Sequence, residues 1–252
     1  MNPLGEDLAA ALDPVTFAGA TAWEPEPWQG GLMRSTSRRV LVSCARQVGK
    51  TETTARKAMH VARYWPGSLV LIFSPSQRQS DELLLRVKAV HRALELPRPK
   101  KSNDSELELE NGSRVVSLPG TEATTRGFAG ARLLILDEAA RIPDDIFHAV
   151  LPMVASEGQM FALSTPWGKR GWFYDLHLDE TNGWERHRVT VHESAQWSER
   201  RIAEVRASVG SFIWSSDYLA EFGDSSSSVF SSEVVAGMFT PAVAPLDLGE
   251  VA

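Results

Sequence analysis

Residues 40–51 read Val-Leu-Val-Ser-Cys-Ala-Arg-Gln-Val-Gly-Lys-Thr, an apolar stretch that runs into a Gly-Lys-Thr triplet. A strand that leads into such a triplet, with a helix after it, is the layout of a phosphate-binding P-loop. The backbone N–H groups of a P-loop and the positive end of the helix dipole face the phosphate oxygens. Lys50 would then neutralise phosphate charge, and Thr51 would offer its hydroxyl to Mg²⁺. The alternative is a capped helix with a solvated lysine, because the full pattern has glycine where this chain has Cys44.

A second apolar run, at residues 133–136, ends in the adjacent acids Asp137 and Glu138. Continuous apolar runs are typical of parallel strands that are buried on both faces. Two carboxylates at the end of such a strand are costly unless they serve a cation or a water molecule. In P-loop ATPases an acid here holds the Mg²⁺ shell, and a following glutamate polarises the attacking water. A helix N-cap would explain one acid but not the pair, so the sequence favours an ATPase that uses ATP and Mg²⁺.

Composition restricts the classes of protein that remain. The length of 252 residues suits one α/β domain with a small appendage. No apolar stretch approaches the length of a membrane span, so we expect no membrane association. The lone cysteine excludes an internal disulfide and fits a reducing cytoplasm. The net charge is −6, so any contact with the negatively charged DNA should be made by a local basic patch. Three clusters of basic residues could form such a patch, and the alternative for each is an ordinary solvated surface. These clusters are Arg34, Arg38 and Arg39; Arg98, Lys100 and Lys101; and Arg186, His187 and Arg188.

Apolar runs alternate with amphipathic segments along the chain. We expect strands at 40–43, 69–73, 133–136, 160–163 and 188–191, helices at 51–65, 77–94 and 144–154, and two helices over 198–221 that break at Gly210. A hairpin of 106–110 with 115–118 should close through a tight Asn111-Gly112 turn. The alternation predicts an α/β fold with a mostly parallel, helix-flanked sheet. Together with the P-loop and the acid pair, we expect a P-loop NTPase of the ASCE, RecA-like class with a small C-terminal helical lid. The ligand crevice should lie at the carboxyl ends of the strands.

Four parts are predicted along the chain. Residues 1–22 are a weakly patterned, partly ordered arm, 23–194 form the P-loop ATPase core, 195–224 form the lid subdomain, and 225–252 are a linker or tail. Asp247 lies in a short apolar run that begins either a further strand or a tail. We favour the tail. A nuclease that uses two metal ions needs several carboxylates, and this run has one, so we expect no nuclease activity.

The Trp28-Gln29 pair lies upstream of the P-loop. A flat side chain beside an amide that both donates and accepts hydrogen bonds suits an adenine base. The alternative is a core tryptophan next to a surface glutamine.

The order of these motifs resembles that of the ATPase domain of the large terminase subunit of tailed bacteriophages, the motor that packages DNA into a procapsid. The resemblance covers residues 24–232, and a P-loop without the leading glycine is a common variant in that family. The motifs that carry it are Trp28-Gln29, residues 43–51, residues 72–77, Thr125-Arg126-Gly127, residues 136–140 and residues 163–166.

The resemblance implies roles for individual residues around the nucleotide. Glu138 would be the catalytic carboxylate, and Arg46 would reach the γ-phosphate. Thr51 and Asp137 would hold Mg²⁺. The implied ATP-binding residues are Trp28, Gln29, Ala45, Arg46, Gln47, Val48, Gly49, Lys50 and Thr51.

The resemblance also implies two elements that act beyond the nucleotide. Ser164 and Thr165 match the motif that couples hydrolysis to movement. Arg126 matches a catalytic arginine finger that acts on a neighbouring subunit, and its glycine-flanked setting suits a mobile element. The alternative for Arg126 is a surface salt bridge.

By the same resemblance, ATP hydrolysis would power translocation of double-stranded viral DNA in the host bacterial cytoplasm, at the portal vertex of the procapsid. The implied partners are double-stranded DNA, the portal protein ring, the small terminase subunit and further copies of this chain in a ring, with a monomer when isolated. Two alternatives stay open, namely a helicase-like or other DNA-stimulated ATPase, and a non-hydrolysing, nucleotide-dependent scaffold on the portal ring. Because Cys44 falls in the P-loop, we also expect its alkylation to block ATP binding.

Overall fold

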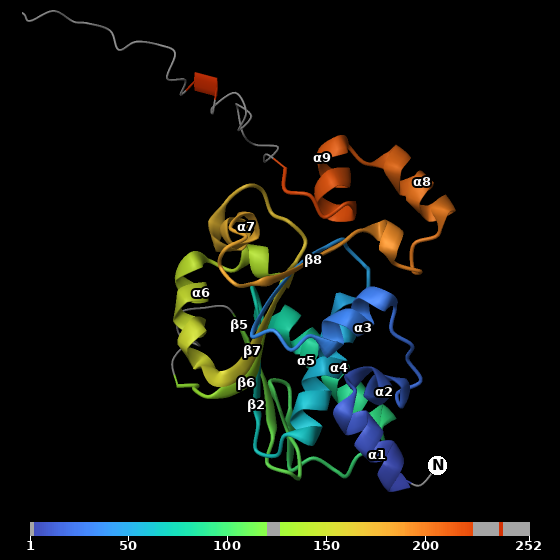
Figure 1. Cartoon of the computed structure of the whole chain (residues 1–252), viewed down its shortest axis with the longest axis vertical. Helices are drawn as coiled ribbons and strands as arrows, with labels where there is room; N and C mark the ends of the chain where they lie inside the picture. Colours follow the sequence, from blue (N-terminus) through green and yellow to red (C-terminus); the bar gives the residue numbers. More distant parts are fainter. Residues whose placement is uncertain (1–2, 120–126, 224–236, 239–252) are drawn as a thin grey trace, which may run out of the picture.

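An eight-stranded sheet runs through the centre of the computed structural model, which describes residues 3–119, 127–223 and 237–238 (Figure 1). The strand order is β3-β4-β5-β2-β6-β7-β1-β8. The strands are Arg39–Cys44 (β1), Leu69–Ser74 (β2), Lys101–Asn103 (β3), Glu106–Glu108 (β4), Arg114–Pro119 (β5), Ala131–Asp137 (β6), Val154–Ser164 (β7) and Glu185–Val189 (β8).

The sheet is parallel except at one edge, where β3 pairs antiparallel with β4, and β4 pairs antiparallel with β5. β1 lies between β7 and β8, and β6 lies between β2 and β7. In this register Ser43 is opposite Ser164, and Asp137 is opposite Leu163. The carboxyl ends of β1, β6 and β7 therefore meet at one edge, as the sequence predicted for the ligand crevice.

Helices cover both faces of the sheet (Figure 1). One face packs against α4 and α5, with Val40 and Val42 of β1 in the same cluster as Ala58 and Leu83. The other face packs against α6 and α7 through Leu41. Because both faces are covered, the strands are continuously apolar, and the predicted α/β layout is confirmed. These helices are Lys50–Tyr64 (α4), Gln77–Ala93 (α5), Asp144–Val150 (α6) and Gly171–Leu178 (α7).

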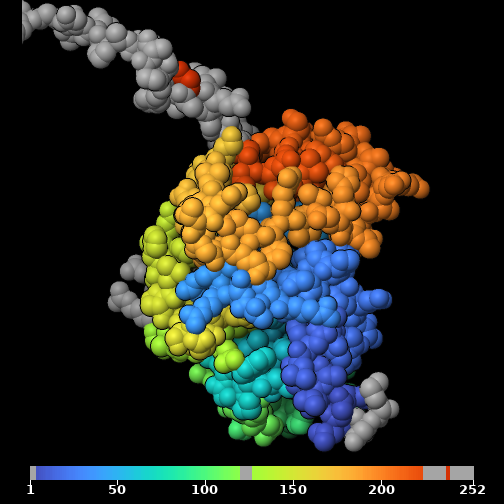
Figure 2. Space-filling view, in the orientation of Figure 1, coloured from blue at the N-terminus to red at the C-terminus, as the bar shows by residue number. Residues whose placement is uncertain are grey.

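The lid follows β8 and lies beyond the carboxyl ends of the central strands (Figure 1). Figure 2 shows it as the orange to red part of the surface at the top of the molecule. Its elements are Glu199–Ser208 (α8), Ser211–Ile213 (α9) and a π-helical turn, Trp214–Tyr218, so the predicted break at Gly210 is present. α8 buries none of its residues, whereas Trp197 and Trp214 join the main core cluster. The lid is thus attached by a few large aromatic side chains.

The N-terminal segment differs from the weakly patterned arm that the sequence predicted. It forms two helices, Pro3–Leu12 (α1) and Pro14–Gly19 (α2), which dock with α3, Pro27–Arg34. Phe17 is buried against α4, and Asp13 caps α2 while pairing with Arg34 at 2.7 Å. The order of this segment comes from tertiary docking, which local patterning does not reveal.

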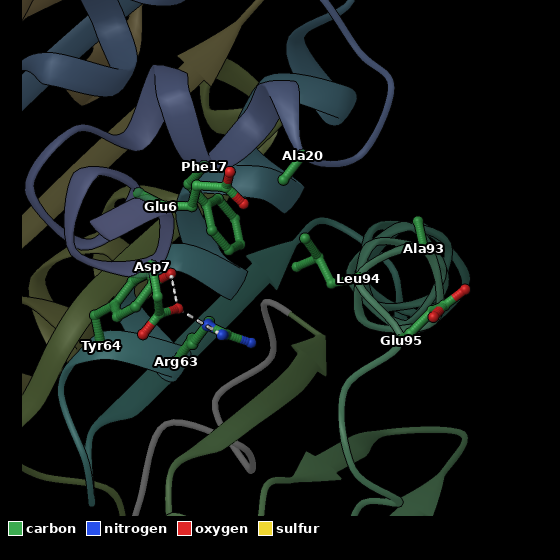
Figure 3. Close-up of a pocket in the computed structure, with 10 residues that line it drawn as sticks. Glu6, Asp7, Phe17, Ala20, Arg63, Tyr64, Ala93, Leu94 and Glu95 are labelled. Atoms are coloured by element: carbon green, nitrogen blue, oxygen red, sulfur yellow. Dashed lines mark hydrogen bonds and ion pairs between the residues drawn. The ribbon is translucent and has the colours of Figure 1, made fainter. Parts of the chain in front are cut away.

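A shallow pocket lies where α1, α2, α4 and the end of α5 meet (Figure 3). Within it Asp7 accepts hydrogen bonds from Arg63 and Tyr64. α1, which lines this pocket, lies at the opposite end of the molecule from α8 and α9 (Figure 1).

The predicted hairpin of β4 with β5 is present, and its tight turn contains Asn111 and Gly112, because the backbone N–H of Gly112 donates to the carbonyl of Leu109. The Asn111 amide also donates to the carbonyls of Ala62 and Arg63 at the end of α4.

Several predicted boundaries are wrong. Residues 101–103 form β3, a short strand that is not among the predicted ones. α6 ends at Val150, β7 begins at Val154, and β8 begins and ends earlier than the predicted strand at 188–191. Short 3₁₀ turns fill Ala139–Arg141, Leu151–Met153 and Val191–Glu193.

His60 of α4 ties α1 to the core, because its Nε2 lies 3.1 Å from the carbonyl oxygen of Ala10. Its ring packs against Phe17 and Tyr64, and Nδ1 is buried with no hydrogen-bond partner among the described residues. Burial, helped by the charge of Lys57, lowers the pKa of His60 to about 4. The imidazole is therefore neutral in the folded protein at physiological pH.

The low pKa of His60 predicts acid sensitivity. The unfolded chain takes up this proton near pH 6.5 and the folded chain near pH 4, so stability is complete above the higher value and is lost as the pH falls. From pH 7 to pH 5 the loss should reach about 2 kcal/mol in the free energy of unfolding. Chemical denaturation at both pH values should show a smaller loss in His60→Gln, whereas His148→Gln, an exposed histidine, should behave like wild type. Equal losses in all three proteins would contradict this assignment.

Candidate functional site

The P-loop joins the end of β1 to the start of α4. Two of its residues have a left-handed backbone, Gln47 (φ 55°) and Gly49 (φ 92°). A Cβ atom on Gly49 would lie 2.7 Å from Nε2 of Gln29 and 3.1 Å from Nε2 of Gln196. Glycine is therefore required at position 49 by both the backbone conformation and the available space.

The segment before the P-loop is held against it. Gln29 is 2% exposed; its Oε1 accepts from the backbone N–H of Glu26 at 2.8 Å, and its Nε2 donates to the carbonyl of Val48 at 3.3 Å. The partly buried Trp28 donates from Nε1 to Glu26. Glu26 also accepts from Ser194 and from the backbone of residue 195, just before the lid. The surface-glutamine alternative is wrong, and this segment connects the P-loop to the start of the lid.

Three charged side chains meet where the P-loop faces the end of β6. Nζ of Lys50 lies 3.5 Å from Oδ1 of Asp137 and forms an ion pair with Oε1 of Glu138. Each of these side chains is at least about four-fifths buried, with exposed fractions of 14%, 12% and 21%. The structure thus brings together the three residues on which the sequence argument depended.

Electrostatics fix the charge states of this cluster. Burial acts to lower the pKa of Lys50, but the carboxylates of Asp137 and Glu138 act together in the opposite direction, and the pKa is raised overall. Burial raises the pKa of Asp137, with the charge of Lys50 opposing the rise. Burial also acts to raise the pKa of Glu138, yet the charge and hydrogen bond of Lys50, helped by the charges of Arg141 and Arg46, leave the pKa below its usual range. Lys50 is therefore a cation and Glu138 an anion at neutral pH.

Glu138 is held in an uncommon backbone conformation, with φ 52° and ψ 40°. A non-glycine residue in this region carries a cost of about 1–2 kcal/mol, which surrounding contacts must offset. One contact is a hydrogen bond from the backbone N–H of Arg141 to the carbonyl of Glu138. The second is an ion pair between Nη1 of Arg141 and Oε2 of Glu138 at 2.7 Å.

The predicted coupling residues lie next to this ion pair. Ser164 is fully buried at the end of β7, and Thr165 follows it at 2% exposure. Nη1 of Arg141 donates to Oγ1 of Thr165 at 3.2 Å, and its guanidinium lies over the Trp167 ring at 4.3 Å. Sequence reasoning missed Arg141, although its position three residues after Glu138 was a usable signal.

Arg46 is directed at the lid in this structure. Its Nε lies 2.9 Å from Oδ2 of Asp217, and its backbone N–H donates to the carbonyl of the same residue. The neighbouring Gln47 accepts a hydrogen bond from Arg201, whose guanidinium stacks on Trp197 at 3.9 Å. Two successive P-loop residues are thus bound by the lid.

Two residues remain around the loop. Thr51 is the second residue of α4 and is partly buried. Ala45 is buried, and its backbone N–H donates to the carbonyl of Val189 in β8. Arg126 and Asp247 lie outside the described residues.

The oxygen donors of Thr51 and Asp137 suit a hard cation that also binds phosphates or water. Within the described ranges there is no group of three or more His, Cys, Asp or Glu side chains that could hold a metal. Thr51 and Asp137 offer one hydroxyl and one carboxylate at the carboxyl end of the sheet. Mg²⁺ is commonly bound by one or two such protein oxygens together with phosphates and water, so the residues fit it.

Cys44 does not belong to the phosphate-facing surface. Its side chain is fully buried, and Sγ lies 3.7 Å from the carbonyl oxygen of Ser164. Burial raises the pKa of the thiol to about 12, so the reactive thiolate is scarce. Alkylation of Cys44 in the folded protein should therefore be slow, because the thiol is buried in the core, and the effect of alkylation on ATP binding stays a prediction.

No helix in the part of the chain that the structure describes is long and apolar enough to cross a membrane.

Comparison with known proteins identifies a family. The profile described as "Terminase large subunit, T4likevirus-type, N-terminal" matches residues 41–235. The large terminase subunits of Thermus phage G20c and Thermus virus P23-45 are each 28% identical to this chain, over 85% of it and 52% of their own length. The chain thus spans about half the length of the curated relatives it matches.

Solved structures show the same fold. The large terminase ATPase domain of Thermus phage P74-26 superposes with a TM-score of 0.72 at 23% identity, covering 82% of this chain and 97% of that one. The large terminase of bacteriophage D6E in complex with ADP gives 0.68 at 11% identity, covering 79% and 54%. That of bacteriophage HK97 gives 0.64 at 16% identity, covering 79% and 51%.

The burial of Cys44 predicts an unreactive thiol. In the folded protein, iodoacetamide should modify it far more slowly than a free cysteine, because the thiol is inaccessible and its pKa is high. Mass spectrometry should show rapid modification only after denaturant unfolds the chain, with Cys44→Ala as the blank. Rapid labelling of the native protein would contradict the placement of this side chain.

Proposed function

This chain belongs to the terminase large-subunit family, to whose N-terminal part it corresponds, and from that membership we propose that it hydrolyses ATP to drive double-stranded viral DNA into a procapsid. The buried cluster of Lys50, Asp137 and Glu138 beside the P-loop supports this function most directly. A buried cation between two acids at the carboxyl ends of the strands is suited to receive phosphates, since the cation can exchange one set of anionic oxygens for another.

The nucleotide would be held by residues from three segments. The P-loop, residues 45–51, would surround the phosphates with backbone N–H groups, and Lys50 would neutralise them. Trp28 and Gln29 would lie against the adenine. Thr51 and Asp137 would hold Mg²⁺, which when bound supplies positive charge to the β- and γ-phosphate oxygens. Among the structural relatives, those of phage D6E carry ADP and ATP-gamma-S in their own structures.

Glu138 would activate the attacking water. In this structure Lys50 holds its pKa low, and a weakly basic carboxylate is a poor proton acceptor. Phosphates that attract the Lys50 ammonium would remove this charge from Glu138 and make it more basic. Arg46 would exchange Asp217 for the γ-phosphate, where a guanidinium stabilises the charge of the transition state.

Assembly and coupling are the next part of the proposal. Ser164 and Thr165 would transmit hydrolysis to movement, and Arg126 would act as a finger in a neighbouring subunit of a homo-oligomeric ring. The partners would be the DNA, the portal ring and the small terminase subunit, at the portal vertex in the host cytoplasm. An isolated domain would then be a weak ATPase, because its sites are completed between subunits.

Removal of the Glu138 carboxylate should separate binding from turnover. Glu138→Gln should bind a fluorescent ATP analogue about as well as wild type, yet phosphate release should fall by about 10²–10⁴-fold, because proton transfer to the carboxylate is lost. Lys50→Ala is the matched variant that should lose binding. Normal turnover in Glu138→Gln would contradict the assignment, as would ATP binding with no turnover in wild type.

The finger role of Arg126 predicts dependence on subunit contact. The turnover per subunit should rise with protein concentration and with added duplex DNA. Arg126→Ala should bind ATP normally and hydrolyse slowly, and mixing it with Glu138→Gln should restore part of the activity, since each subunit supplies what the other lacks. A turnover per subunit that is independent of concentration, together with no recovery on mixing, would count against a finger in trans. Unwinding of a tailed duplex would instead favour a helicase.

A further inference from the structure

The side chain of Arg141 makes three contacts, and none of the residue roles proposed so far involves Arg141. Its Nη1 pairs with Oε2 of Glu138 at 2.7 Å and reaches Oγ1 of Thr165 at 3.2 Å. Its guanidinium also lies over the ring of Trp167, with the central carbon 4.3 Å from the ring centroid. One side chain thus joins the end of β6 to the segment that follows β7.

The surroundings separate this contact from an ordinary surface ion pair. The side chains of Arg141 and Glu138 are only 24% and 21% exposed. By contrast, the exposed pair of Arg200 and Glu204 on α8 has side-chain exposures of 89% and 62%. Water screens a pair of the second kind and leaves it with little effect, whereas the first kind is screened much less.

Trp167 is one of the large apolar side chains that the structure leaves exposed, at 48%. An indole ring over a guanidinium attracts it and shields it from water on one face. This explains why an aromatic residue is tolerated at the surface of the site, since it covers Arg141.

Arg141 and Lys50 divide the Glu138 carboxylate between them, with one oxygen each. In the proposed cycle Lys50 moves to the phosphates, and Arg141 is then the cation that stays on the carboxylate. Glu138 also has a left-handed backbone that needs local support, and Arg141 supplies it through both its backbone N–H and its side chain.

We propose that Arg141 is a positioning residue that aims the Glu138 carboxylate and ties it to Thr165, so that the hydrolytic group and the segment after β7 move together. This inference rests on the proposed ATPase function and deepens it. Arg141 acts through Glu138 and need not touch the nucleotide.

Steady-state ATPase kinetics and nucleotide binding test this role. Arg141→Ala should keep KM and the affinity for a fluorescent ATP analogue, while kcat falls by up to about 100-fold, because a misaimed catalytic group loses rate and not binding. Arg141→Lys should recover part of kcat, since the charge remains without the planar contact to Trp167. Millimolar guanidinium ion should partly restore turnover in Arg141→Ala and should not do so in Glu138→Gln. Arg200→Ala, which removes an exposed arginine–glutamate pair, should match wild type.

A double-mutant comparison tests the tie to Thr165. If Thr165 acts through Arg141, the variant that combines Arg141→Ala with Thr165→Val should be no slower than Arg141→Ala alone; independent roles would multiply the two losses. The inference is overturned if Arg141→Ala has wild-type kcat, or if its loss of activity follows a loss of thermal stability and neither lysine nor guanidinium restores it. A wild-type chain that does not hydrolyse ATP would instead overturn the proposed function, and that failure is visible before any Arg141 variant is measured.

Discussion

Burial of Lys50 between Asp137 and Glu138 is the constraint on which the site depends. A charge that leaves water must be paired almost fully, and breaking such a pair leaves an uncompensated charge at large cost. The pairing requires the start of α4 to lie beside the end of β6, and the sheet order places them so, because β6 is separated from β1 only by β7. The parallel topology thus brings one cation and two acids together at the carboxyl ends of the strands.

The second level of organisation is the attachment of the lid to the P-loop. Arg46 is bound by Asp217, Gln47 by Arg201, and Glu26 links the segment before the loop to residues 194–195. These contacts are polar and partly solvent-exposed, and they can be exchanged at modest cost. The aromatic anchors Trp197 and Trp214 are buried and hold the lid in place. A P-loop that rearranges around phosphates would therefore change the polar contacts that join it to the lid.

Much of the fold and part of the site follow from the sequence, for identifiable reasons. The central strands and their order of motifs are predictable, because a strand buried on both faces must be apolar and must end in a turn. The positions of Lys50 and Asp137 are predictable because each follows or ends one of these apolar strands, where phosphate and metal ligands are expected. The helices at residues 3–19 and the partners of Arg46 are not predictable, since they depend on contacts between segments far apart in the chain. Arg141 lay within reach of local reasoning, but its contact with Thr165 exists only because β6 and β7 are neighbours.

Cys44 shows why a sequence pattern has to be converted into geometry residue by residue. The generic P-loop has glycine there, yet Cys44 is the last residue of β1 and is absent from the residues with positive φ. Its side chain enters the core beside the end of β7, where a small apolar group packs well. At Gly49 the opposite holds, because φ is 92° and the Gln29 amide fills the space that a Cβ atom would need. The first glycine of the P-loop pattern is thus dispensable, since Cys44 replaces it. The second, Gly49, is required by its backbone conformation and by the packing of Gln29 against it, and this packing holds the loop beside Lys50, Asp137 and Glu138.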